Sequence, residues 1–268
     1  MLKTRVITAL CLLAAFLVVL LWLPKPAAAA AFGLVAVLAA WEWAGLMKIG
    51  PTGRILFGAV IAACCLAAYH QSNLALPGLW WLSAAFWVLL APVWLARRWT
   101  LSASAFLGFV TGWVLIVPTW AAMVDLHSRG AGYLFGAMAA VWVADIAAYF
   151  AGRAFGRHKL APAISPGKTW EGAGGGVGGV LAYAAVVAAL FFPEILGHAG
   201  KLAIGAALLV LLTAVSIQGD LFESLVKRQA GVKDSSGLLP GHGGVLDRID
   251  SQTSALPLVA LFLAVVAR

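Results

Sequence analysis

Long apolar runs dominate this sequence and constrain its fold more than any other feature. Of its 268 residues, 63% are hydrophobic and only 10% are charged, whereas a soluble domain has about 25% charged residues. Because roughly 20 apolar residues are enough for a helix to cross a bilayer, the pattern predicts an all-α bundle of about nine membrane-spanning helices. The expected spans are 6–23, 27–47, 55–70, 77–96, 103–124, 131–151, 173–193, 202–219 and 252–267.

We expect one membrane domain over residues 1–268, with N-terminal spans in residues 1–130 and the catalytic spans in residues 131–268. Two polar loops, 152–172 and 220–251, interrupt the second part. If the N-terminus is cytoplasmic, only 4 of the 18 Lys and Arg residues fall in outer segments, namely Lys25, Arg129, Lys201 and Arg268. Since basic residues concentrate on the cytoplasmic side of membrane proteins, this split predicts a cytoplasmic N-terminus and places both loops on the cytoplasmic face.

The net charge of +8 has the same explanation. Basic residues between apolar runs are typical of membrane topology and of contact with anionic lipid, so we expect no nucleic-acid partner. The three cysteines, Cys11, Cys64 and Cys65, lie inside apolar runs. Neither a disulfide framework nor a thiolate metal site is therefore expected.

The first candidate site follows the span 202–219. If that helix continues, Asp220, Ser224 and Lys227 lie on one face, with Glu223 as the alternative to Ser224. An acid, a second polar group and a cation at this spacing could bind a metal ion and a phosphate side by side. An interfacial ladder of ion pairs has the same spacing, so the pattern alone leaves both interpretations open.

The second candidate is the segment 240–250, which reads Pro-Gly-His-Gly-Gly-Val-Leu-Asp-Arg-Ile-Asp. Its glycines allow backbone N–H groups to approach a phosphate closely. Asp247 and Asp250 are three residues apart at the start of the last span, so both can face one cation. Mg²⁺ prefers such carboxylates together with substrate phosphate. Capping of the helix by carboxylates is the alternative, and it explains one aspartate more easily than two.

The third candidate is the first polar loop, where residues 167–169 read Gly-Lys-Thr as at the end of a P-loop. The upstream glycine that a P-loop requires is Pro162 here, and a membrane span follows, so we reject that interpretation. Lys168, with Arg157 and Lys159, can still bind phosphates, although the same charges would serve topology. The glycine-rich run 172–179 predicts a face for close helix packing.

Two acids lie inside apolar runs, Asp145 and Glu42. An acid at membrane depth is energetically expensive and usually faces a polar interior or a partner. Asp145 lies well inside its run, so we expect it to serve the site. Glu42 lies nearer the end of its run, where the membrane interface is within reach, and we expect no role for it.

These segments resemble the phosphatidate cytidylyltransferases, also called CDP-diacylglycerol synthases. The family motif is Ser, two residues, Lys-Arg, four residues, Lys-Asp, then Pro-Gly-His-Gly-Gly, two residues, Asp-Arg, one residue, Asp. Every fixed position is matched, by Ser224, Lys227, Arg228, Lys233, Asp234, Pro240, Gly241, His242, Gly243, Gly244, Asp247, Arg248 and Asp250. The likeness covers about residues 142–256 and departs at Ile146 and Ala147, where family members often have Ser or Thr and then Gly.

The resemblance implies that the protein joins CTP to phosphatidate, giving CDP-diacylglycerol and diphosphate with a divalent cation. We assign Mg²⁺ to Asp220 and Asp247, with Asp250 as a further ligand, and leave a second ion open. The groups expected to bind substrate or to shape its cradle are Lys168, Ser224, Lys227, Arg228, Lys233, His242, Gly243, Gly244, Arg248 and Asp145. The resemblance further implies an integral protein of the bacterial inner membrane, with a cytoplasmic active site, and a homodimer.

Two other functions are alternatives to this one. A transporter would spread its acids through several spans along an ion path, whereas here they cluster with basic, glycine-rich loops on one face. A CDP-alcohol phosphotransferase also acts at the membrane with a metal ion, but its D-G-x-x-A-R run is missing. Transfer of label from CTP into lipid would separate all three.

Overall fold

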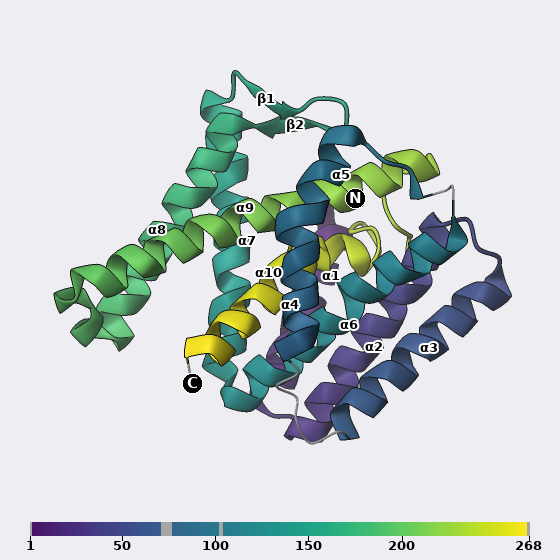
Figure 1. Ribbon diagram of the computed structural model, residues 1–268, viewed down its shortest axis with the longest axis horizontal. Helices are drawn as coiled ribbons and strands as arrows, with labels where there is room; N and C mark the ends of the chain where they lie inside the picture. The colour runs from purple at the N-terminus through teal and green to yellow at the C-terminus, as the bar shows by residue number, and fades with distance from the viewer. Residues whose placement is uncertain (1, 71–76, 102–103, 267–268) are drawn as a thin grey trace.

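The computed structural model describes residues 2–70, 77–101 and 104–266, which are mostly helical (Figure 1). Within these residues, nine helices are long and apolar enough to span a membrane, so the predicted all-α bundle and its number of spans are confirmed. The helices are α1 (Leu2–Leu21), α2 (Lys25–Leu46), α3 (Pro51–His70), α4 (Pro77–Ala85), α5 (Ala91–Arg97), α6 (Ala105–Arg129), α7 (Ala131–Phe155), α8 (Trp170–Phe191), α9 (Ala199–Ala230) and α10 (Leu246–Val266).

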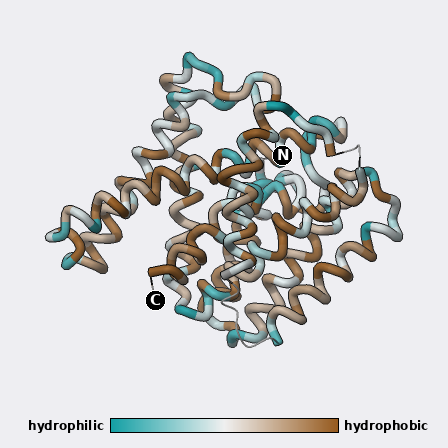
Figure 2. The backbone as a smooth tube through the Cα atoms, in the orientation of Figure 1, coloured by the Kyte–Doolittle hydropathy of each residue, from teal (hydrophilic) through white to brown (hydrophobic). Residues whose placement is uncertain are grey.

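Two short helices also lie within the described residues. A π-helix, η1 (Phe86–Leu90), joins α4 to α5, so that these three elements form one span. A 3₁₀ helix, η3 (Pro193–Gly197), connects α8 to α9. Hydrophilic residues gather mainly in the connections and at helix ends, while the long helices are mainly hydrophobic (Figure 2).

The observed boundaries differ from the predicted ones mainly around the polar segment before α10. Helix α9 runs to Ala230 instead of ending at residue 219, and α10 begins at Leu246 instead of residue 252. Charged residues at the end of α9 pair with charged residues at the start of α10, as Lys227 does with Asp247. Both helices therefore continue through these residues, and the connection between them is only residues 231–245. Residues 103 and 267, predicted as the ends of two spans, lie outside the described residues.

The connection between α7 and α8 forms a short antiparallel hairpin of β1 (Lys159–Ala161) and β2 (Ser165–Thr169), at the top of Figure 1. Thr169 ends β2 and caps α8, because its Oγ1 accepts a hydrogen bond from the N–H of Gly172 at 3.1 Å. The Gly-Lys-Thr tripeptide thus ends a hairpin strand before a membrane helix, which agrees with the rejection of a P-loop.

Helices α7 and α8 approach each other closely through small residues. A Cβ atom added to Gly175 or Gly179 of α8 would collide with the side chain of Ala151 or Ala147 of α7. Small residues let membrane helices come this close, so the predicted packing face at residues 172–179 is confirmed.

Helix α10 lies in the middle of the bundle and packs against α9, α6 and α4 (Figure 1). Phe222 of α9 packs edge-on against Phe86, Trp87 and Trp94 of η1 and α5. The indole N–H of Trp87 donates to the carbonyl of Thr253 on α10 at 3.1 Å. The η1–α5 segment therefore holds α9 and α10 together next to the polar residues that both helices carry.

Candidate active site

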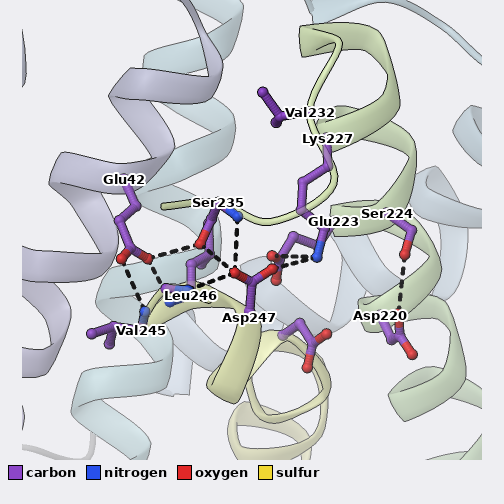
Figure 3. Close-up of polar contacts among 12 residues, drawn as sticks. Glu42, Asp220, Glu223, Ser224, Lys227, Val232, Ser235, Val245, Leu246 and Asp247 are labelled. Carbon is purple, nitrogen blue, oxygen red and sulfur yellow. Dashed lines mark hydrogen bonds and ion pairs between the residues drawn. The ribbon is translucent and has the colours of Figure 1, made fainter. Parts of the chain in front are cut away.

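Lys227 lies at the centre of the polar cluster between α9 and α10. Its Nζ contacts Oδ1 of Asp247 at 2.5 Å and Oε1 of Glu223 at 3.0 Å (Figure 3). The lysine is only 8% exposed and Glu223 only 2%. A buried charge needs such partners to offset its lost hydration, so this ammonium is committed to protein carboxylates rather than free for substrate.

Asp247 has its two oxygens fully engaged within the protein. While Oδ1 contacts Lys227, Oδ2 accepts hydrogen bonds at 2.8 Å from the Ser235 N–H, the Ser235 hydroxyl and the Gly244 N–H. The aspartate lies in the first turn of α10, where a carboxylate also benefits from the helix dipole. In this geometry Asp247 holds the loop and Lys227 in place. This agrees with the alternative in which the aspartate caps the helix instead of binding a metal ion.

Asp220 pairs with the lysine of the β hairpin. Its Oδ2 contacts Nζ of Lys168 at 2.6 Å, and its Oδ1 accepts a hydrogen bond from Ser224 at 3.2 Å. The two charged side chains are 31% and 23% exposed, so a ligand can reach both. The hairpin thus brings the third candidate segment into contact with the first.

Asp145 and Asp250 lie close to this ion pair, and Asp145 is exposed whereas Asp250 is partly buried. The charged and polar neighbours of Asp145 are Lys168, Asp220 and Ser251. Asp250 in turn has Asp220 and Asp145 as acidic neighbours. Helices α7, α9 and α10 therefore each contribute one aspartate to the same region, with Lys168 above them, and Asp145 belongs to the cluster as expected.

The remaining predicted cations lie on the surface around this region. Arg228, Lys233 and Arg248 are exposed, and none of them forms an ion pair within the described parts of the chain. The guanidinium of Arg228 donates to the Val232 carbonyl at 3.1 Å. Unlike Lys227, these three cations are available for an anionic ligand.

The glycine-rich loop is folded around protein carboxylates. Gly243 has φ +80°, and a side chain there would collide with Asp247. A side chain on Gly244 would collide with Ser235 and Glu42. His242 is partly buried, and its backbone N–H donates to the Leu239 carbonyl at 2.8 Å. The N–H of Gly244, which was predicted to face a phosphate, thus donates to Asp247 instead. The glycine pattern predicts a loop that binds an anion, but it does not distinguish a protein carboxylate from a phosphate.

Glu42 was missed by the sequence prediction, which placed it at the membrane interface without a role. It is 0% exposed and accepts hydrogen bonds from residues on both sides of the glycine-rich loop. Its position inside an apolar run was the available signal. The sequence did not identify the partners of Glu42, because the residues that donate to it lie about 200 positions later in the chain.

Magnesium fits Asp220 and Asp250 better than Asp247. Across residues 2–70, 77–101 and 104–266, no group of three or more His, Cys, Asp or Glu side chains is arranged to hold a metal ion by itself. Mg²⁺, however, is commonly bound by one or two carboxylates together with substrate phosphates. Asp220 is 31% exposed and Asp250 is a partly buried neighbour of it, whereas both oxygens of the buried Asp247 already have partners within the protein.

The fold is that of an integral membrane protein, and the cluster offers carboxylates and cations that suit a ligand with phosphate groups. The family model described as "Cytidylyltransferase family" matches residues 3–266. A phosphatidate cytidylyltransferase of Pseudomonas aeruginosa is 44% identical over 98% of this chain and 97% of its own length. One of Haemophilus influenzae is 35% identical over 98% of both chains, and one of Brucella suis is 53% identical over 48% of this chain and 46% of its own. The chain therefore belongs to the cytidylyltransferase family and is a nucleotidyltransferase.

The accessible ion pair between Lys168 and Asp220 generates a kinetic prediction. If Lys168 exchanges Asp220 for a substrate phosphate, Lys168→Ala should raise the KM for CTP or phosphatidate by about threefold or more. Lys201→Ala is the control, because Lys201 is exposed at the opposite end of α9 from Asp220 and has no ion pair within the described residues. Steady-state kinetics of the purified variants would measure the effect. Equal KM values for both variants would mean that Lys168 does not bind substrate and that its charge serves only membrane topology.

Proposed function

We propose that the protein transfers the cytidylyl group of CTP to phosphatidate, giving CDP-diacylglycerol and diphosphate. The observation that carries this proposal is the 44% identity, over nearly the whole chain, to a relative named phosphatidate cytidylyltransferase. The residues of the family motif also lie around one charged region between α7, α9, α10 and the β hairpin, with Lys227 and Asp247 buried and Asp220, Arg228, Lys233 and Arg248 more accessible. That region adjoins the apolar helices, so a lipid substrate and a water-soluble nucleotide can both reach it.

The reaction needs positioning and charge neutralisation more than a general base. A phosphatidate oxygen attacks the α-phosphorus of CTP in line, and the bond from that phosphorus to the bridging oxygen of diphosphate breaks. Phosphate is already a competent nucleophile, so alignment of the two anionic substrates supplies much of the rate. Lys168, Arg228, Lys233 and Arg248 are the side chains available to offset their negative charge.

We propose that Asp220 and Asp250 hold the Mg²⁺ ion, with Asp145 beside them. When bound there, the ion would supply positive charge that partly neutralises the phosphate groups of CTP. Asp247 would instead keep Lys227 and the glycine-rich loop in place, which revises its predicted role as a metal ligand. Ser224 would orient Asp220 through their hydrogen bond.

The proposed reaction can be tested with purified protein in lipid vesicles. Radiolabelled CTP and phosphatidate should give label in the extracted lipid and an equal amount of diphosphate. Diacylglycerol in place of phosphatidate should give neither, because it lacks the phosphate nucleophile. A protein that incorporates no label with phosphatidate, or as much with diacylglycerol, would not be the proposed enzyme.

The different roles of Asp220 and Asp247 give a second test. Both Asp220→Asn and Asp247→Asn should lower kcat at least about tenfold, a loss of roughly 1.4 kcal/mol in transition-state stabilisation. Only Asp220→Asn should also raise the Mg²⁺ concentration that gives half-maximal rate, because only Asp220 is a proposed ligand. Chelation by EDTA should silence the wild type until Mg²⁺ is added back. A shifted Mg²⁺ requirement in Asp247→Asn alone would reverse the assignment.

We further propose that the protein lies in the bacterial inner membrane with its N-terminus and its site in the cytoplasm. His198, before α9, and Gly237, before α10, are exposed, and this orientation puts them on opposite sides of the membrane. In a variant without Cys11, Cys64 and Cys65, His198→Cys should react with an impermeant maleimide in right-side-out vesicles. Gly237→Cys should react only after the vesicles are opened, and the opposite pattern would invert the orientation.

A further inference from the structure

Glu42 is a buried carboxylate without a cationic partner among the described residues. Burying an unpaired charge is strongly unfavourable unless hydrogen bonds replace its hydration. Three donors serve Glu42 alone: the Ser236 hydroxyl at 2.6 Å, the Leu246 N–H at 2.7 Å and the Val245 N–H at 2.9 Å. The fourth, the Ser235 hydroxyl at 3.0 Å, shares its single proton between Glu42 and Asp247. Each carboxylate oxygen faces one hydroxyl and one backbone N–H.

The two backbone donors belong to the beginning of α10. The first N–H groups of a helix have no partner within the helix, and the positive end of the helix dipole favours an anion there. Glu42 therefore caps α10 from another helix, α2. The two serines lie on the other arm of the loop that precedes α10, so one carboxylate ties both arms of this loop to the N-terminal half of the protein.

Ser235 connects this cap to the charged centre of the site (Figure 3). Its hydroxyl lies 3.0 Å from Glu42 and 2.8 Å from Asp247. Asp247 contacts Lys227, which contacts Glu223. A continuous set of polar contacts therefore runs from α2 through the loop to α10 and α9.

We propose that Glu42 is a positioning residue of the transferase site, a role that rests on the proposed function. It touches no reacting group. It fixes the loop that carries Lys233, the start of α10 that carries Arg248, and the orientation of Asp247. Substrate phosphates then meet cations that are already in place, which is the preorganisation that phosphoryl transfer depends on.

The variant Glu42→Gln tests this role, because glutamine keeps the size of the side chain but has one acceptor oxygen instead of two. Its amide group must face a hydroxyl and a backbone N–H that both donate to Glu42 in the wild type. Hydrogen–deuterium exchange should become at least about tenfold faster in peptides covering residues 233–247, equivalent to roughly 1.4 kcal/mol. Exchange elsewhere in the bundle should stay unchanged.

Kinetics provide the second readout. Glu42→Gln should lower kcat and also raise the KM for CTP by about threefold or more. A smaller folded fraction lowers the apparent kcat but cannot change KM, so the KM shift separates positioning from general destabilisation. If Glu42→Gln does not insert, Ser236→Ala removes one of the four donors and should shift exchange and KM in the same direction by less.

Asp125→Asn is the matched control. Asp125 is a buried carboxylate of the N-terminal half, 6% exposed, which pairs with Arg129 on its own helix at 2.7 Å and has no contact with the loop. This variant should leave both the exchange of residues 233–247 and the KM for CTP unchanged.

Three outcomes would overturn the proposal. They are unchanged loop exchange in Glu42→Gln, exchange that rises equally throughout the bundle, and faster loop exchange with unaltered kinetics. A wild-type protein without cytidylyltransferase activity would instead refute the proposed function. The exchange comparison with Asp125→Asn would then still decide whether Glu42 holds the loop.

Discussion

The contact between Lys227 and Asp247 joins the two helices that carry the site. Helix α9 contributes the lysine, α10 contributes the aspartate, and the loop between them is folded onto the second oxygen of that aspartate. Because both side chains are buried, loss of either would leave the other as an uncompensated charge, which is far more destabilising than loss of a surface pair. The geometry of the neighbouring acids and cations follows from this connection.

The charged residues of the site fall into two groups with different environments. Lys227, Glu223 and Asp247 contact one another in the interior, where they are buried. The second group consists of Lys168, Asp145, Asp220 and the surface cations Arg228, Lys233 and Arg248, with the partly buried Asp250 beside Asp220. The first group connects α9, α10 and the loop between them, and the second is the one that we propose meets the anionic substrates and a metal ion.

Much of this arrangement could be predicted from local pattern. Apolar runs identified the spans, glycine spacing identified the face of α8 that packs on α7, and helical spacing put Asp220 beside Ser224. The role of Glu42 could not be predicted, because its donors are distant in sequence and an acid near the end of an apolar run is consistent with an interfacial position. The role of Asp247 was also ambiguous, since a carboxylate at a helix start can cap the helix or bind a metal, and only its contacts distinguish the two.

The pairing of Glu42 with the start of α10 has a consequence for biosynthesis. The carboxylate is made more than 200 residues before the amide of Leu246 that it binds, which at about 5–20 residues per second means a delay of roughly 10–40 s. During that interval α2 holds an acid whose donors do not yet exist, so the end of the helix that carries it must stay near water. Docking of the last helix then completes the burial of the second, so membrane insertion of the N-terminal half and its final packing are separate events in time.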